Sequence, residues 1–108
     1  NSVSALLSAD NGIGLPTEFA LKQNYPNPFN PSTQIRYALP EESMVTITIY
    51  DLMGRKVRTL VNDVQSAGYR TVMWNATNDM GRAVSAGMYI YTIQAGDFVM
   101  NRKMVLMK

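Results

Sequence analysis

From residue 34 onward, apolar and polar residues alternate along short runs, which is the pattern of half-buried β-strands. In the clearest run, Val45, Ile47 and Ile49 alternate with threonines and a tyrosine, and β-branched residues are common in strands. Turn residues separate six or seven such runs about every 8–12 residues. No segment has a convincing helical period. The pattern predicts an all-β sandwich.

The same alternation predicts which side chains form the core. Val57 and Leu60 lie three residues apart in the strand expected at residues 56–61, which breaks the alternation and predicts a β-bulge. Gly54 stands in the preceding hairpin loop, where a positive φ is expected. The predicted inward-facing residues are Ile35, Tyr37, Leu39, Val45, Ile47, Ile49, Val57, Leu60, Val72, Trp74, Tyr89, Tyr91, Ile93 and Leu106.

Residues 24–33 do not follow the strand pattern. They hold three prolines and three asparagines. Each proline fixes φ and removes a backbone donor, and the residue before it is kept out of the helical region. The segment is therefore predicted to be a stiff extended loop, held to a neighbouring surface by Tyr25 and Phe29. Taken on composition alone, it is an ordered entrance to a β-domain.

The last run of the chain is apolar without alternation. Met104, Val105, Leu106 and Met107 stand between two lysines. Such a run is typical of a strand covered on both faces. Either the segment at residues 24–33 covers the second face, or a partner protein does.

Composition excludes several classes of function. The chain has no cysteine and no histidine, so a disulfide framework, a thiolate metal site and a Ser-His triad are excluded. Ten basic and eight acidic residues give a net charge of +2, and the basic residues are scattered, unlike the basic stripe of a nucleic-acid-binding protein. No apolar run approaches the roughly 18 residues of a membrane span.

No group of residues is arranged as an active site, so we expect neither an enzyme nor a cofactor. Asn75, Asn78 and Asp79 crowd one turn, but calcium usually takes six to eight oxygen ligands with several carboxylates. Side chains that bond their own backbone explain this turn better. Residues 1–16 are small and polar, which predicts a linker or flexible arm before a single domain at residues 17–108.

Four pieces of the sequence resemble one known family. Residues 25–33 read Tyr-Pro-Asn-Pro-Phe-Asn-Pro-Ser-Thr, and residues 45–55 form a strand that ends in Tyr-Asp-x-x-Gly-Arg. Trp74 is followed at residues 78–91 by a series with Gly-Arg-x-Val and Gly-x-Tyr-x-Tyr, and the chain closes with a lysine-hydrophobic-lysine ending. Together these pieces resemble the C-terminal sorting domains of the bacterial type IX secretion system. The motif positions are Tyr25, Pro26, Asn27, Pro28, Phe29, Asn30, Pro31, Gly54, Trp74, Gly81, Gly87 and Tyr89.

The resemblance implies a seven-stranded antiparallel immunoglobulin-like sandwich, akin to the domain of the flagellar hook-capping protein. It implies an address tag on a cargo protein that is exported through the periplasm to the cell surface or the extracellular space. The partners implied are the outer-membrane translocon, a sortase-like protease that removes the tag and attaches the cargo to lipopolysaccharide, and an upstream cargo domain. The cut is expected within residues 1–16. The expected recognition residues are those of the terminal strand, Lys103, Met104, Val105, Leu106, Met107 and Lys108.

Two other classes remain open from the sequence. One is an immunoglobulin-like structural or adhesive module that stays on a surface protein. The other is a carbohydrate-binding accessory domain, which needs an exposed aromatic platform, whereas the periodicity places most aromatic residues elsewhere.

Overall fold

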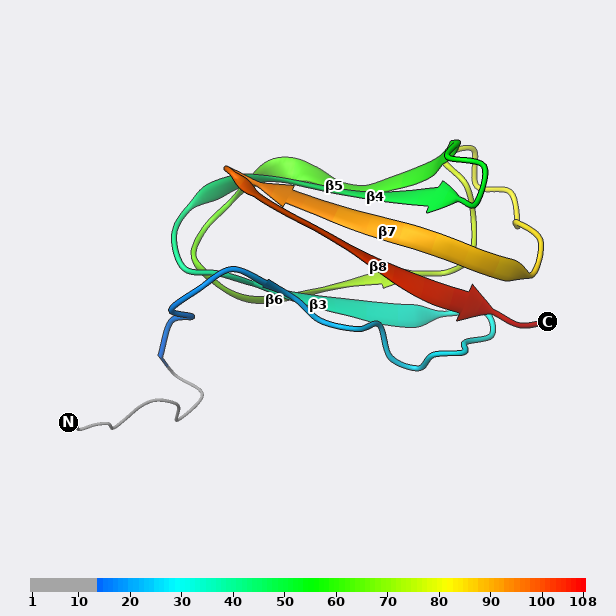
Figure 1. The fold of residues 1–108 in the computed structure, drawn as a ribbon, viewed down its shortest axis with the longest axis horizontal. Helices are drawn as coiled ribbons and strands as arrows, with labels where there is room; N and C mark the ends of the chain where they lie inside the picture. Colours follow the sequence, from blue (N-terminus) through cyan, green and yellow to red (C-terminus); the bar gives the residue numbers. More distant parts are fainter. Residues whose placement is uncertain (1–13) are drawn as a thin grey trace.

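The structure is a computed structural model that describes residues 14–108, and in this part of the chain it is all-β. Two antiparallel sheets face one another as the layers of a sandwich (Figure 1). The small sheet has the order β2-β3-β6 and the large sheet the order β5-β4-β7-β8. The strands are β2 (Ala20–Leu21), β3 (Thr33–Leu39), β4 (Ser43–Asp51), β5 (Lys56–Gln65), β6 (Gly68–Trp74), β7 (Gly87–Ala95) and β8 (Phe98–Leu106). This confirms the prediction of a seven-stranded antiparallel sandwich of the immunoglobulin-like kind.

The core lies between the two sheets and contains the residues that alternation predicted. Trp74 is fully buried at its centre, with ring centroids 5.8 Å from Phe29 and 5.3 Å from Tyr89. Val57, Leu60 and Val72 are only partly buried and pack against the edge of the cluster. The prediction missed five members, because they lie outside the clear runs or have small side chains: Leu21, Phe29, Ala76, Ala95 and Met104.

Strand β5 contains two irregularities. Ile47 and Thr48 of β4 pair with Val61 and Thr59, so Leu60 has no opposite residue. The register shifts again where Ile49 and Tyr50 pair with Arg58 and Lys56, so Val57 has no opposite residue either. The predicted bulge is confirmed, and it occurs twice. Each extra residue bends the strand and changes the direction of the side chains. Val57 and Leu60 can therefore both reach the edge of the core although they lie three residues apart.

The described residues include no helix that is long and apolar enough to cross a membrane.

Candidate recognition surface

The terminal strand β8 alternates more than its sequence suggests. Met104 and Leu106 are fully buried in the core, Val105 is half-buried, and Met107 is 54% exposed. Lys103 and Lys108 are exposed. Of the two covers expected for the outer face, the proline-rich segment is therefore ruled out, and cover by a partner protein stays a prediction. A two-layer sandwich covers one face of each sheet, and no described segment covers the outer face of β8.

The proline-rich segment instead closes the open edge of β8. The Phe29 amide donates to the Val105 carbonyl over 3.0 Å, and the Met107 amide donates to the Phe29 carbonyl over 2.8 Å. The Val105 amide donates to Oδ1 of Asn27 over 3.0 Å. Nε2 of Gln23 donates to the Lys103 carbonyl over 2.7 Å. From Lys103 to Met107, every second residue of this edge, whose backbone would otherwise face solvent, thus has a partner.

The segment is held in the core by Phe29 and not by Tyr25. Phe29 is 2% exposed and contacts Trp74, whereas Tyr25 is 73% exposed. The expectation for Tyr25 is wrong, because its backbone pairs with Gln34 in both directions, over 2.9 and 3.0 Å, and that pairing turns its ring outward. The other motif residues of the segment, Pro26, Asn27, Pro28, Asn30 and Pro31, are exposed.

A buried asparagine anchors the start of the segment. Nδ2 of Asn24 donates to Oγ1 of Thr33 over 3.0 Å and to the Pro26 carbonyl over 3.2 Å. The Asn24 amide donates to the Tyr91 hydroxyl over 2.7 Å. Sequence reasoning missed this residue. The available signal was an asparagine two residues before a proline, since Asn side chains commonly bond nearby backbone.

The hydroxyl of Tyr91 ties the large sheet to this segment. It accepts from the Asn24 amide and donates to the Lys22 carbonyl over 2.9 Å. Burial raises the pKa of Tyr91 above its ordinary value of 10.0, and the hydrogen bond from Asn24 and the charge of Arg102 oppose only part of this rise. Nε of Arg102 donates to the Leu21 carbonyl over 2.6 Å. We call the combined surface of residues 23–31 and 102–108 the terminal seam.

Two loops of the sandwich are built alike. In each, a side-chain oxygen, from Asp51 or Asn78, accepts from the amides two and four residues later. Each loop also has a glycine in the left-handed region, Gly54 with φ 82° and Gly81 with φ 81°. The hydrogen bonds from the Arg55 amide, the Met53 amide and the Arg55 side chain lower the pKa of Asp51. These motif glycines therefore serve the geometry of the turns.

The side-chain oxygens of the turn at residues 75–79 accept hydrogen bonds from the protein itself. Oδ1 of Asn75 accepts from Thr77, Oδ1 of Asn78 from its own loop, and Oδ1 of Asp79 from the Thr59 amide of β5. Within residues 14–108, no group of three or more His, Cys, Asp or Glu side chains is arranged to hold a metal ion.

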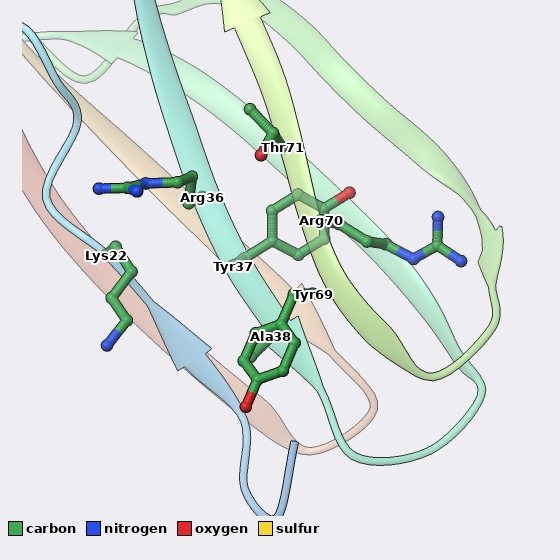
Figure 2. Close-up of a pocket in the computed structure, with 7 residues that line it drawn as sticks. All are labelled: Lys22, Arg36, Tyr37, Ala38, Tyr69, Arg70 and Thr71. Atoms are coloured by element: carbon green, nitrogen blue, oxygen red, sulfur yellow. The ribbon is translucent and has the colours of Figure 1, made fainter. Parts of the chain in front are cut away.

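A hollow on the outer face of the small sheet carries positive charge. Figure 2 shows that Lys22 and Arg36 lie on the same side of this hollow. Tyr69 and Thr71, from strand β6, also line it. The Lys22 amide donates to the Arg36 carbonyl over 2.8 Å, so the two cations are cross-strand neighbours. The one ion pair among residues 14–108 joins Arg55 to Asp51, in a different loop.

The described residues of this face do not form a continuous aromatic platform. Tyr25 and Tyr69 are exposed, but they lie at opposite ends of the strand pairing: Tyr25 beside Gln34, and Tyr69 beside Ala38. The Lys22–Arg36 pair lies between them.

Comparisons with known proteins place the fold. A family model described as the FlgD Ig-like domain matches residues 30–97. That range begins inside the proline-rich segment and ends before β8. A comparison with curated proteins gave no match.

Three solved structures are similar. Dimeric latent PorU from Porphyromonas gingivalis has a TM-score of 0.65 and 21% identity, over 80% of this chain and 9% of PorU. PorZ, described as an essential bacterial surface component of the type IX secretion system of the same organism, has a TM-score of 0.57 and 20% identity, over 80% of this chain and 11% of PorZ. FlgD from P. aeruginosa has a TM-score of 0.54 and 21% identity, over 70% of this chain and 64% of FlgD. This chain therefore spans about a tenth of PorU and PorZ, and at these identities the likeness concerns the fold.

Proposed function

The chain belongs to the FlgD Ig-like domain family, and we propose that it is the C-terminal sorting domain of a type IX secretion cargo. The outer-membrane translocon recognises the domain, and a sortase component removes it when the cargo is attached to the cell surface. The domain itself has no catalytic role. The similarity of fold to PorZ, a component of that system, supports the proposal.

The terminal seam is the observation that carries the proposal. Two of the four pieces that resemble sorting domains, residues 25–33 and residues 102–108, lie far apart in the sequence. Three hydrogen bonds join them side by side: the Val105 amide donates to Asn27, the Met107 amide donates to Phe29, and the Phe29 amide donates to Val105. A receptor that reads both pieces thus meets a single surface, with Lys103, Met107 and Lys108 exposed along it.

The rigidity of the seam suits recognition. Its backbone is fixed by prolines, by Phe29 in the core and by the buried side chain of Asn24. A surface that is already ordered loses little conformational entropy when it binds. The seam also forms only when residues from both ends of the domain have folded together, so a receptor that binds it selects folded domains.

The upstream cargo would join the domain away from the seam. In Figure 1 the first described residues enter at the end of the sandwich opposite the C-terminus. Leu15 is 64% exposed there, and Pro16 is buried. The proposed cut lies within residues 1–16, of which residues 1–13 are outside the described part of the chain. A cut at this end leaves the folded domain intact.

A secretion assay tests the proposal. The complete chain is fused to the C-terminus of a reporter with a signal peptide, in a bacterium that has a functional type IX system. We expect the reporter to reach the surface or the medium, with the sorting domain cleaved off. When the translocon is inactivated, the reporter should remain in the periplasm.

A control fusion that ends at residue 13 should remain in the periplasm. Retention of the complete fusion in the periplasm, with the domain folded, would overturn the proposal. Surface display of an uncut fusion would instead favour the structural or adhesive module.

A further inference from the structure

Strand β6 has an open edge. Among residues 14–108 its only strand partner is β3, and the pairing runs without a register shift from Gly68 to Trp74. The strand contains no proline, lysine or bulge, which are the usual means of blocking an edge. Its one charged side chain, Arg70, is bound back to the carbonyl and Oγ of Ser66, over 3.1 and 2.6 Å.

The register shows which backbone groups face outward. Gln34 of β3 exchanges both of its backbone hydrogen bonds with Tyr25, on the side away from β6. Its partner Met73 therefore belongs to a non-hydrogen-bonded pair and directs its own amide and carbonyl to the open edge. By the two-residue period of the strand, Thr71 and Tyr69 do the same.

The other long edges of the sandwich are each covered along part of their length. Residues 23–29 cover the edge of β8, as described above. On β5, the Asp79 amide donates to the Val57 carbonyl over 3.1 Å, and the Thr59 amide donates to the Asp79 side chain over 3.1 Å. Among these long edges, only that of β6 has no such hydrogen bonds to another segment of residues 14–108.

The exposed side chains of this edge are self-complementary. Tyr69 is 67% exposed, Met73 is 56% exposed, and Thr71 lies between them on the same outer face. If a second β6 runs antiparallel beside the first with Thr71 opposite Thr71, each Tyr69 lies opposite a Met73. Methionine sulfur makes favourable contacts with aromatic rings, and none of these three residues is charged.

We propose that β6 pairs with β6 of a second copy of this chain, about a two-fold axis at Thr71. The pairing joins two three-stranded sheets into one continuous sheet of six strands. Tyr69, Thr71 and Met73 form three hydrogen-bonded pairs with two bonds each, which satisfies all six outward backbone groups. Such a contact is isologous, so it closes as a dimer and does not propagate into a filament.

The dimer should be weak, because a single strand pair buries far less than the roughly 1,200–2,000 Å² of a stable interface. A dissociation constant on the order of 0.1 mM is reasonable for such a contact. The complete chain is therefore studied by sedimentation equilibrium between about 10 µM and 1 mM. We expect the average mass to rise from 12.0 kDa towards twice that value.

A lysine substituted on the β6 edge tests whether the copies meet at this edge or elsewhere. Thr71→Lys places two ammonium groups opposite each other at the axis and should keep the chain monomeric at all concentrations. The matched control is Gln94→Lys, which adds the same charge at an exposed position on the central strand β7 and should leave the dimer intact. Circular dichroism and Trp74 fluorescence check that both variants are folded.

Cysteine cross-linking locates the axis. Because the chain contains no cysteine, a single introduced cysteine can form a disulfide only between copies. Cα atoms of a hydrogen-bonded pair lie about 5.5 Å apart, which a disulfide spans. Thr71→Cys should form the dimer at least about tenfold faster than Gln94→Cys under mild oxidation.

A chain that is monomeric at 1 mM overturns the proposal and leaves the edge to another occupant. A dimer that persists in Thr71→Lys also overturns it, because the copies then meet elsewhere. Equal cross-linking rates for Thr71→Cys and Gln94→Cys, or a faster rate for Met73→Cys than for Thr71→Cys, reject the axis at Thr71.

Discussion

Strands β8 and β6 lie at the edges of the two sheets, and the chain treats these edges differently. At β8, four outward backbone groups of Lys103, Val105 and Met107 bind partners in residues 23–29. At β6, the outward groups of Tyr69, Thr71 and Met73 have no partner strand within residues 14–108. An unpaired edge is a template for other chains. The contrast shows that the proline-rich segment is an edge cover, and that its removal would leave β8 as open as β6.

The largest effect should come from the anchor of that cover. Phe29→Ala removes a buried aromatic side chain that contacts Trp74, and it should lower the free energy of unfolding by about 3–5 kcal/mol. Tyr25→Ala, in the same segment, should change it by less than about 0.5 kcal/mol, because that ring is exposed. Urea denaturation followed by Trp74 fluorescence gives both values. Similar losses for the two variants would contradict the assignment of Phe29 as the anchor.

A smaller loss is expected at the buried asparagine. Asn24→Ala leaves Thr33 and the Pro26 carbonyl without their amide partner, and it should cost about 1–3 kcal/mol. Asn30→Ala is the matched control, since Asn30 is exposed in the same segment and its loss should cost less than about 0.5 kcal/mol. The same denaturation experiment compares the two. A cost at Asn30 that equals the cost at Asn24 would show that the hydrogen bonds of Asn24 do not hold the cover.

The tyrosine hydroxyl under the cover should make stability depend on alkaline pH. Burial raises the pKa of Tyr91 above 10.0 in the folded state, so its contribution is complete below the unfolded value and is lost as pH rises through the folded value. Tyr91→Phe removes two hydrogen bonds and should cost about 1–3 kcal/mol at pH 8. Its stability should then fall less steeply above pH 10.0 than that of the unmodified chain.

Burial also raises the pKa of Tyr37, so part of the slope should remain in the Tyr91→Phe variant. Tyr37→Phe removes that part. A profile between about pH 8 and pH 11 that is identical in the unmodified chain and in Tyr91→Phe would contradict the account of Tyr91.

The smallest expected effect is a difference in amide hydrogen exchange between the edges of β8 and β6. In dilute solution the amides of Val105 and Met107 should exchange their hydrogens at least about tenfold more slowly than those of Tyr69, Thr71 and Met73, because only the former are hydrogen-bonded. Asn27→Ala should speed exchange at Val105 and leave β6 unchanged. Equal protection of the two edges would contradict the description of residues 23–29 as a cover.

Alternation in the sequence was sufficient for the fold because most side chains of β3, β4 and β7 either enter one core or face solvent. It also predicted a bulge in β5 from the broken period at Val57 and Leu60, although not that the register shifts twice. Alternation did not predict which side chains are buried at residues 24–33, because this segment has no period and burial there depends on tertiary contacts. Nothing local distinguishes Tyr25, which is exposed, from Phe29, which is buried.

For the terminal strand, the sequence left two covers open for the outer face. The structure rules out the proline-rich segment, since Met107 is exposed, and cover by a partner protein stays a prediction. The cover found there acts on backbone groups along the edge, and hydrophobicity does not report backbone pairing. The sequence marked both pieces of the seam by their resemblance to sorting domains. Only the structure shows that the two pieces are in contact.

The central claim is that the terminal seam is the surface that the translocon reads, and a comparison of two reporter fusions tests it most directly. One carries Lys103→Ser, Met107→Ser and Lys108→Ser, which change exposed seam residues and leave Phe29 and Asn27 in place. The other carries Lys22→Ser, Tyr69→Ser and Met73→Ser, equally exposed on the small sheet. With both domains shown to be folded, the account predicts that the first reporter stays in the periplasm and the second is secreted normally. Normal secretion of the first reporter would contradict it.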